Sequence, residues 1–183
     1  MTATHVALFR GINVGKAKRI AMADLRELLE GLGHGDVSTL LNSGNALFSA
    51  PAAPVDKLAA RIHAAVAKQL GVDARVIVKS ARDVAGMVDG NRLAAVCTDD
   101  SRLLVAMSDD ARVLAGVRAL AGADWGEERI HLGKHAAYVW CAQGILESEA
   151  LDALMKGMGG AATTRNWATL RKIHALLSAD DGR

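Results

Sequence analysis

The sequence predicts an α+β protein made of two ferredoxin-like halves, each a split βαβ plait, with a helix at the C-terminus. Two observations support this prediction. Short apolar runs, typical of buried strands, alternate with longer stretches in which apolar residues recur every three or four positions, as they do on one face of a helix. The order strand–helix–strand–strand–helix also occurs twice, so we expect one plait-like subdomain in residues 1–85 and another in residues 86–183.

The composition indicates an aliphatic core. Of the 183 residues, 51% are hydrophobic and only 3% are aromatic. The net charge of +2 comes from 22 basic and 20 acidic side chains, which is too balanced to indicate nucleic-acid binding through charge alone. Cys97 and Cys141 fit neither a metal-binding spacing nor a disulfide framework. With no basic leader and no long apolar segment, we expect a cytoplasmic protein that holds no metal.

The first half begins with an apolar run at residues 6–9, interpreted as a buried strand. Leucines between residues 25 and 32 then recur on one helical face, and glycines end that helix. A second helix opens at Pro54 and closes at Gly71, and another strand follows at residues 75–79.

A polar tetrapeptide, residues 42–45, separates two further strand candidates at residues 37–41 and 46–48. Its composition fits a hairpin turn between two strands. It fits equally a glycine bulge inside one long strand.

The second half repeats this order. A strand at residues 102–107 precedes a helix capped by Asp109 or Asp110, and strands at residues 129–132 and 136–140 form a hairpin.

Two more helices complete the second half. Ser148 caps the first of them, and the last starts at Thr163 or Thr164 and buries Trp167. Residues 80–100 are interpreted as the connection between the halves.

Three short polar segments combine glycine or a helix-start residue with Asn and Arg, which are residue types common in recognition sites. We call residues 10–15 the first motif, residues 42–45 the second motif and residues 163–167 the third motif. The candidate ligand-binding residues within them are Arg10, Gly11, Asn13, Asn42, Ser43, Asn45, Thr164, Arg165 and Asn166.

The first motif follows a strand and precedes a helix, as a phosphate-binding loop does, but it is not a P-loop. Only three residues separate Gly11 from Gly15 where that motif has four, and Ala17 replaces the hydroxyl that would hold magnesium. Its glycines can still turn backbone amides toward an anion. The basic side chains nearby, which either assist such a site or are simply solvated, are Arg10, Lys16, Lys18 and Arg19.

The third motif is the strongest anion candidate. A helix start at Thr164 would leave backbone N–H groups free to receive an oxyanion, and Arg165 would add a bidentate donor there. Two plainer interpretations remain open: Arg165 pairs with a carboxylate, and Trp167 belongs to the core. For the second motif, the Asn side chains either shape the turn or offer donors and acceptors to a ligand.

Together the three motifs resemble a bacterial family, the domain of unknown function 1697. The resemblance covers about residues 6–177 and departs at Lys16, where the family commonly has glycine, and at Ala168, where it has a polar residue. It implies an α+β protein with two plait-like subdomains. It implies no activity, cofactor or catalytic residue.

The leading functional prediction is binding of a small anionic ligand, a nucleotide or phosphorylated metabolite, where the three motifs converge. Single-stranded RNA is less favoured because the aromatic residues on the predicted strands look buried. One alternative is an enzyme that uses the same pocket, although no motif contains Asp, Glu, His or Cys. The other is a structural or protein-interaction module whose motifs form an internal hydrogen-bond network. We expect no cofactor.

Overall fold

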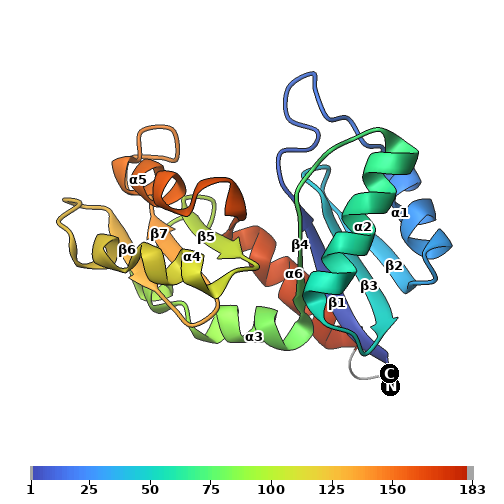
Figure 1. Ribbon diagram of the computed structural model, residues 1–183. Coiled ribbons are helices and arrows are strands. Elements are labelled where there is room, and N and C mark those ends of the chain that lie inside the picture. Colours follow the sequence, from blue (N-terminus) through green and yellow to red (C-terminus); the bar gives the residue numbers. More distant parts are fainter. Residues whose placement is uncertain (1, 181–183) are drawn as a thin grey trace. The chain divides into compact units, whose positions relative to one another are not determined.

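The computed structural model describes residues 2–180, and the chain divides into two compact units (Figure 1). Unit 1 comprises the chain up to Arg82 and again from Ile173 onward, and unit 2 comprises Asp83–Lys172. Each unit contains a four-stranded antiparallel sheet with split βαβ connections, so the predicted α+β class is confirmed. The division into subdomains at residues 85 and 86 stays a prediction.

The sheet of unit 1 has the order β2-β3-β1-β4. All of its neighbouring strands are antiparallel, and β2 pairs with β3 through a register that places Leu40 opposite Asn45. The strands are β1 (Thr2–Phe9), β2 (Gly35–Leu40), β3 (Asn45–Pro51) and β4 (Val76–Ser80). Residues 41–44 therefore form a hairpin turn, and the alternative of one bulged strand is wrong.

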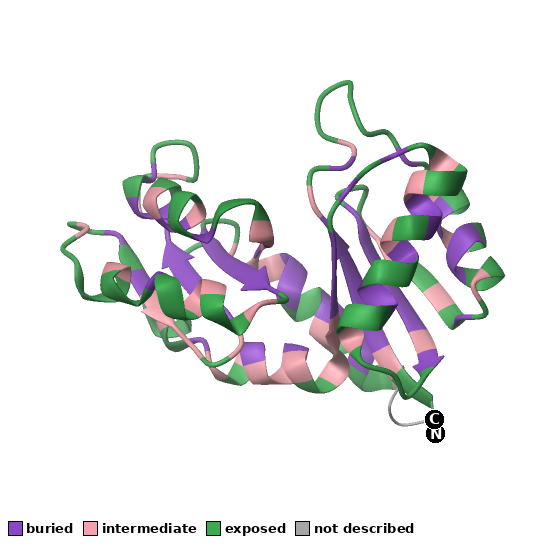
Figure 2. Ribbon diagram, viewed as in Figure 1, coloured by how far each residue is buried: buried purple, intermediate pink, exposed green. Residues whose placement is uncertain are grey.

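Two helices cover one face of this sheet, α1 (Met22–Gly31) and α2 (Val55–Leu70). Their leucines pack with Phe9 and Phe48 in a single core, and Figure 2 shows the strands buried while the outer helix faces are exposed. Pro54 and Gly71 delimit α2 as predicted, and Gly71 adopts φ +66°.

The predicted connection at residues 80–100 contains regular structure. It forms α3 (Ala81–Asp89) and a short 3-10 helix, η1 (Arg92–Ala95), capped by Asn91. Gly86 and Gly90 indicate a loop in the sequence, but Gly86 lies inside α3, where a Cβ would stand 2.8 Å from the ring of His135. Glycine at this position therefore leaves room for the His135 side chain.

The sheet of unit 2 has the order β6-β7-β5-β8, the counterpart of the order in unit 1. The strands are β5 (Leu103–Ser108), β6 (Arg129–Leu132), β7 (Ala137–Trp140) and β8 (Ala162–Asn166). The other elements before α6 are α4 (Ala111–Gly116), η2 (Arg118–Gly122), α5 (Glu149–Met158) and η3 (Gly159–Ala161).

Two predicted caps of unit 2 are confirmed. Asp110 accepts from the backbone N of Arg112 at the start of α4, and Ser148 accepts from that of Leu151 in α5. The α4 helix is short because the chain tightens into η2 after Gly116.

The predicted start of the last helix is wrong. Residues 162–166 form β8 beside β5, and the helix α6 (Trp167–Asp180) begins only afterwards. Thr163 and Thr164 are β-branched and suit a strand. Asn166 caps α6 instead, because its Oδ1 accepts from Thr169 N at 2.9 Å.

None of the helices in residues 2–180 is both long and apolar enough to cross a membrane.

Candidate functional site

The first two motifs lie together in unit 1. Phe9 N donates to Gly44 O at 2.9 Å, and Gly44 packs against the buried side chain of Ile12. A Cβ at Gly44 would stand 2.7 Å from Ile12 Cδ1 and 2.8 Å from Phe9 Cβ, and the residue has φ +85°. Glycine is therefore required at this position, and it holds the hairpin against the first motif.

Asn13 connects the first motif to the start of α1 and to the second motif. Its Oδ1 accepts from Ile20 N at 2.9 Å, and its Nδ2 donates to Ile20 O at 2.8 Å and to Asn42 O at 2.9 Å. Its backbone lies in the left-handed region with φ 57°, which Asn tolerates better than most residues. The side-chain amide of Asn13 thus fixes the conformation of this loop through hydrogen bonds within the protein.

Asn45 also has an internal role. It is fully buried, and its Nδ2 donates to Leu40 O at 2.8 Å and to Ser43 Oγ at 3.2 Å, which closes the hairpin. For Asn13 and Asn45, the internal network that the sequence left as an alternative is present in the structure.

A shallow pocket of about 330 Å³ opens between these loops and the start of α1, and we call it the α1 pocket. Its lining residues are Asn13, Arg19, Ile20, Ala21, Met22 and Asn42.

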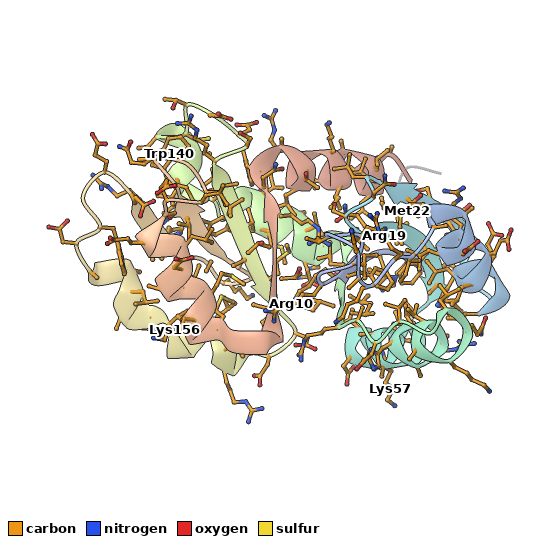
Figure 3. All side chains as sticks on the ribbon, turned by 90° about the horizontal axis from the view of Figure 1, so that it is seen from above. Arg10, Arg19, Met22, Lys57, Trp140 and Lys156 are labelled. Carbon is orange, nitrogen blue, oxygen red and sulfur yellow. The ribbon has the colours of Figure 1, made fainter. Side chains whose placement is uncertain are left out.

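Two polar side chains of the α1 pocket have no partner among residues 2–180. They are the exposed guanidinium of Arg19 and the side-chain amide of Asn42, whose backbone oxygen alone is engaged by Asn13. Figure 3 shows Arg19 beside Met22, with Lys57 apart from them on α2. Ala21, the N-cap residue of α1, supplies no side-chain cap. Within the described residues, the start of α1 therefore has no side-chain cap, and Met22, its first residue, lines this pocket.

The other candidates of the first two motifs do not line this pocket. Arg10 is half-buried and donates its backbone N–H to Arg75 O at 2.9 Å. Gly11 is exposed with φ +66°, and Ser43 lies in the hairpin turn beside Asn45.

The third motif belongs to unit 2 and lies mostly on β8. Arg165 pairs with Val105 of β5, is 8% exposed, and donates from one nitrogen to Thr163 Oγ1 at 3.0 Å and Thr164 O at 2.7 Å. Burial lowers the pKa of Arg165 to about 10, so the side chain remains charged at neutral pH. The predicted oxyanion site at a helix start on Thr164 is wrong, because Thr164 lies within a strand.

Arg19 and the N-terminus of α1 are not among the predicted site residues. From the sequence, Arg19 is only one of the basic residues that either assist a site or are solvated. The available signal was its position three residues before the helix start at Met22, in a segment without Ser, Thr, Asp or Asn to cap the helix.

The α1 pocket offers binding groups and no acid–base catalyst. None of its lining residues is Asp, Glu, His or Cys. Across residues 2–180, no group of three or more such side chains is arranged to hold a metal ion.

Comparisons with known proteins identify the fold and the family. No curated protein matches the chain significantly. The structure of conserved bacterial protein SP0830 from Streptococcus pneumoniae is similar, with a TM-score of 0.74 and 22% sequence identity over 97% of this chain and 99% of that chain. At that identity the likeness shows the fold alone.

A family model described as "Protein of unknown function (DUF1697)" matches residues 1–138, a range that includes the first two motifs and ends before the third. The resemblance noted in the sequence is confirmed: the chain belongs to the DUF1697 family.

Proposed function

We propose that this protein binds a small anionic ligand, a nucleotide or a phosphorylated metabolite, in the α1 pocket. The observation that carries the proposal is the guanidinium of Arg19, which has no partner within residues 2–180, at the uncapped start of α1. The guanidinium and the helix start both attract negative charge to the α1 pocket. The guanidinium is positively charged, and the helix dipole is positive at the start of α1, where the first backbone N–H groups of a helix have no partner within the helix.

The other lining groups suit a ligand that is polar at one end. The free amide of Asn42 can orient it through one donor and one acceptor. Lys16 and Lys18, both exposed in the same loop, raise the positive potential around the pocket. A volume of about 330 Å³ accommodates a small molecule.

Two alternatives receive less support. Plait proteins that bind RNA stack bases on exposed strand aromatics, and here Phe9, Phe48, Tyr138 and Trp140 are all buried. Catalysis in the α1 pocket lacks a titratable lining group, although a ligand could supply its own. Ligand binding by Thr164, Arg165 and Asn166 stays a prediction.

The test is calorimetric titration of the full chain with inorganic phosphate, AMP and a sugar phosphate. We expect Arg19→Gln to weaken binding of the anion about tenfold, since one charge-assisted hydrogen bond contributes roughly 1.5–3 kcal/mol. Lys57→Gln removes the same charge from the surface of α2 and should leave the affinity unchanged. Binding that both variants weaken equally, or no binding of any of the three anions, would refute the proposal. Arg165→Gln in the same titrations tests the third motif.

A further inference from the structure

Unit 2 contains a cavity of about 400 Å³ that is lined by α4, η2, β6 and the turn after β6. We call it the α4 pocket. It shares no residue with the α1 pocket or with the three motifs. Its lining combines three basic side chains with an aliphatic surface and includes no acidic residue.

The basic side chains of the α4 pocket come from three places in the fold. Arg118 belongs to η2, His131 to β6, and Lys134 to the turn between β6 and β7. Within the described part of the chain, the side chain of none of the three forms a hydrogen bond or an ion pair. Unit 2 as a whole contains more acidic than basic side chains, so its composition does not explain this convergence. Basic groups gathered without a counter-charge favour binding of an anion.

Tyr138 holds the wall that carries His131 and Lys134. The rings of His131 and Tyr138 stack at 5.7 Å between centroids, and the hydroxyl of the buried Tyr138 donates to Met87 O at 2.7 Å. A Cβ at Gly133 would stand 2.9 Å from Tyr138 Cε2, so glycine lets the turn lie close to this ring. The basic wall is therefore fixed before a ligand arrives, which reduces the entropy lost on binding.

Apart from Gly133, the rest of the lining is aliphatic. Leu114 of α4 and Leu132 of β6 pack against the core of unit 2 but are only half-buried, and both line the α4 pocket. Alanines of α4 and η2 complete this surface. A ligand that matches both parts of the lining has an anionic head and a hydrocarbon tail.

We propose that the α4 pocket binds an aliphatic carboxylate, an acid with an unbranched hydrocarbon tail. The guanidinium of Arg118 donates two parallel hydrogen bonds to the carboxylate, and Lys134 adds a positive charge beside it. His131 offers a ring nitrogen as a further donor. The tail packs on Leu114 and Leu132, where each buried methylene strengthens binding.

The experiment is calorimetric titration of the full chain with octanoate, hexanoate and butanoate. We expect saturable binding of one octanoate per chain and an affinity that falls about tenfold for every two methylenes removed from the tail. Octylamine has the same number of carbons and the opposite charge, so it should bind at least about tenfold more weakly than octanoate.

Variants of the basic residues locate the site. Arg118→Gln and Lys134→Gln should each weaken octanoate binding about tenfold, and the fold should be retained because both positions are exposed. A matched control, Lys156→Gln, removes one exposed charge from α5 outside the α4 pocket and should change the affinity by less than about twofold. Arg19→Gln should also leave octanoate binding unchanged, which separates this site from the α1 pocket.

Four results would overturn this proposal. Two of them are the absence of saturable octanoate binding and an affinity that does not depend on the length of the tail. The third is binding of octylamine as tight as that of octanoate, which would show an apolar surface without preference for an anion. The fourth is an equal loss of affinity in Lys156→Gln and in the two pocket variants, which would show attraction by net charge only.

Discussion

Asn13 uses one side chain to fix three backbone groups. Its amide makes a two-way pair with Ile20 and a third bond to Asn42 O, so it sets the path of the loop that leads into α1. This loop carries Arg19, the residue on which the proposed anion site depends. The contribution of Asn13 to binding is therefore indirect: it positions the pocket wall.

Asn13→Ala should lower the free energy of unfolding by about 2–4 kcal/mol, because three hydrogen bonds are lost and Ala is strained at positive φ. Asn13→Gly loses the same hydrogen bonds without the strain and should cost less. Urea denaturation measures both. Val14→Ala, a change at an exposed neighbour, serves as the control and should shift the value by less than about 0.5 kcal/mol. A neutral Asn13→Gly variant would show that the hydrogen bonds do not stabilise the fold.

His34 should make the stability of the protein sensitive to acid. Its ring is tilted against Phe48 at 4.5 Å between centroids, and Nε2 has no partner among residues 2–180. Burial, followed by the charges of Arg61 and His5, lowers the pKa of His34 below its ordinary 6.5. The unfolded chain then binds this proton more readily than the folded one, so stability is full above that value and falls as the pH drops below it.

The corresponding measurement is urea denaturation at several pH values between about 7 and 5. The parent protein should lose stability across this window, and His34→Phe should lose less of it. Equal slopes for the two proteins would mean that another group is responsible.

At the scale of elements, the hairpin between β2 and β3 depends on one glycine. Gly44→Ala combines a close contact with Ile12 and Phe9 and an unfavourable positive φ, so we expect a loss of about 2–4 kcal/mol. Gly116→Ala at the end of α4 meets open space and should be neutral or stabilise by up to about 1 kcal/mol. Thermal unfolding of the two variants should give shifts of opposite sign or of very different size. Similar shifts would contradict the packing of Gly44.

Local signals predicted most elements because the deciding residues lie inside the element. Ser148, Asp110, Pro54 and Gly71 act at the helix ends where their chemistry predicts. The strand β8 was missed because its pairing with β5 is made across more than fifty residues of chain, and the two threonines that suit a strand also suit a helix cap.

The candidate site also combines features that local sequence predicts with features that depend on distant contacts. Gly and Asn in the first two motifs indicate unusual backbone conformations in loops. In the structure, Asn13 and Asn42 of these motifs line the α1 pocket. The side-chain amides of Asn13 and Asn45 stabilise the loops by hydrogen bonds to the backbone. The sequence does not predict this role, because it does not show which atoms these amides contact. The sequence signals the uncapped start of α1 only by lacking a capping residue there. Arg19 becomes a candidate binding residue only when the structure places it beside that helix start.

At the scale of the whole molecule, one strand order is used twice. Membership of the DUF1697 family and the likeness to the streptococcal protein establish the fold. Beyond the fold, the function we propose is the binding of an anion at the start of α1 by Arg19.

The most direct measurement of that claim is a ¹⁵N–¹H correlation spectrum of the full chain titrated with AMP and with inorganic phosphate. We predict that the largest shifts fall on the backbone amides of residues 20–24 and on the side-chain Nε of Arg19, and that Arg19→Gln reduces them. Saturable shifts centred on another part of the chain, with the amides at the start of α1 unmoved, would contradict it.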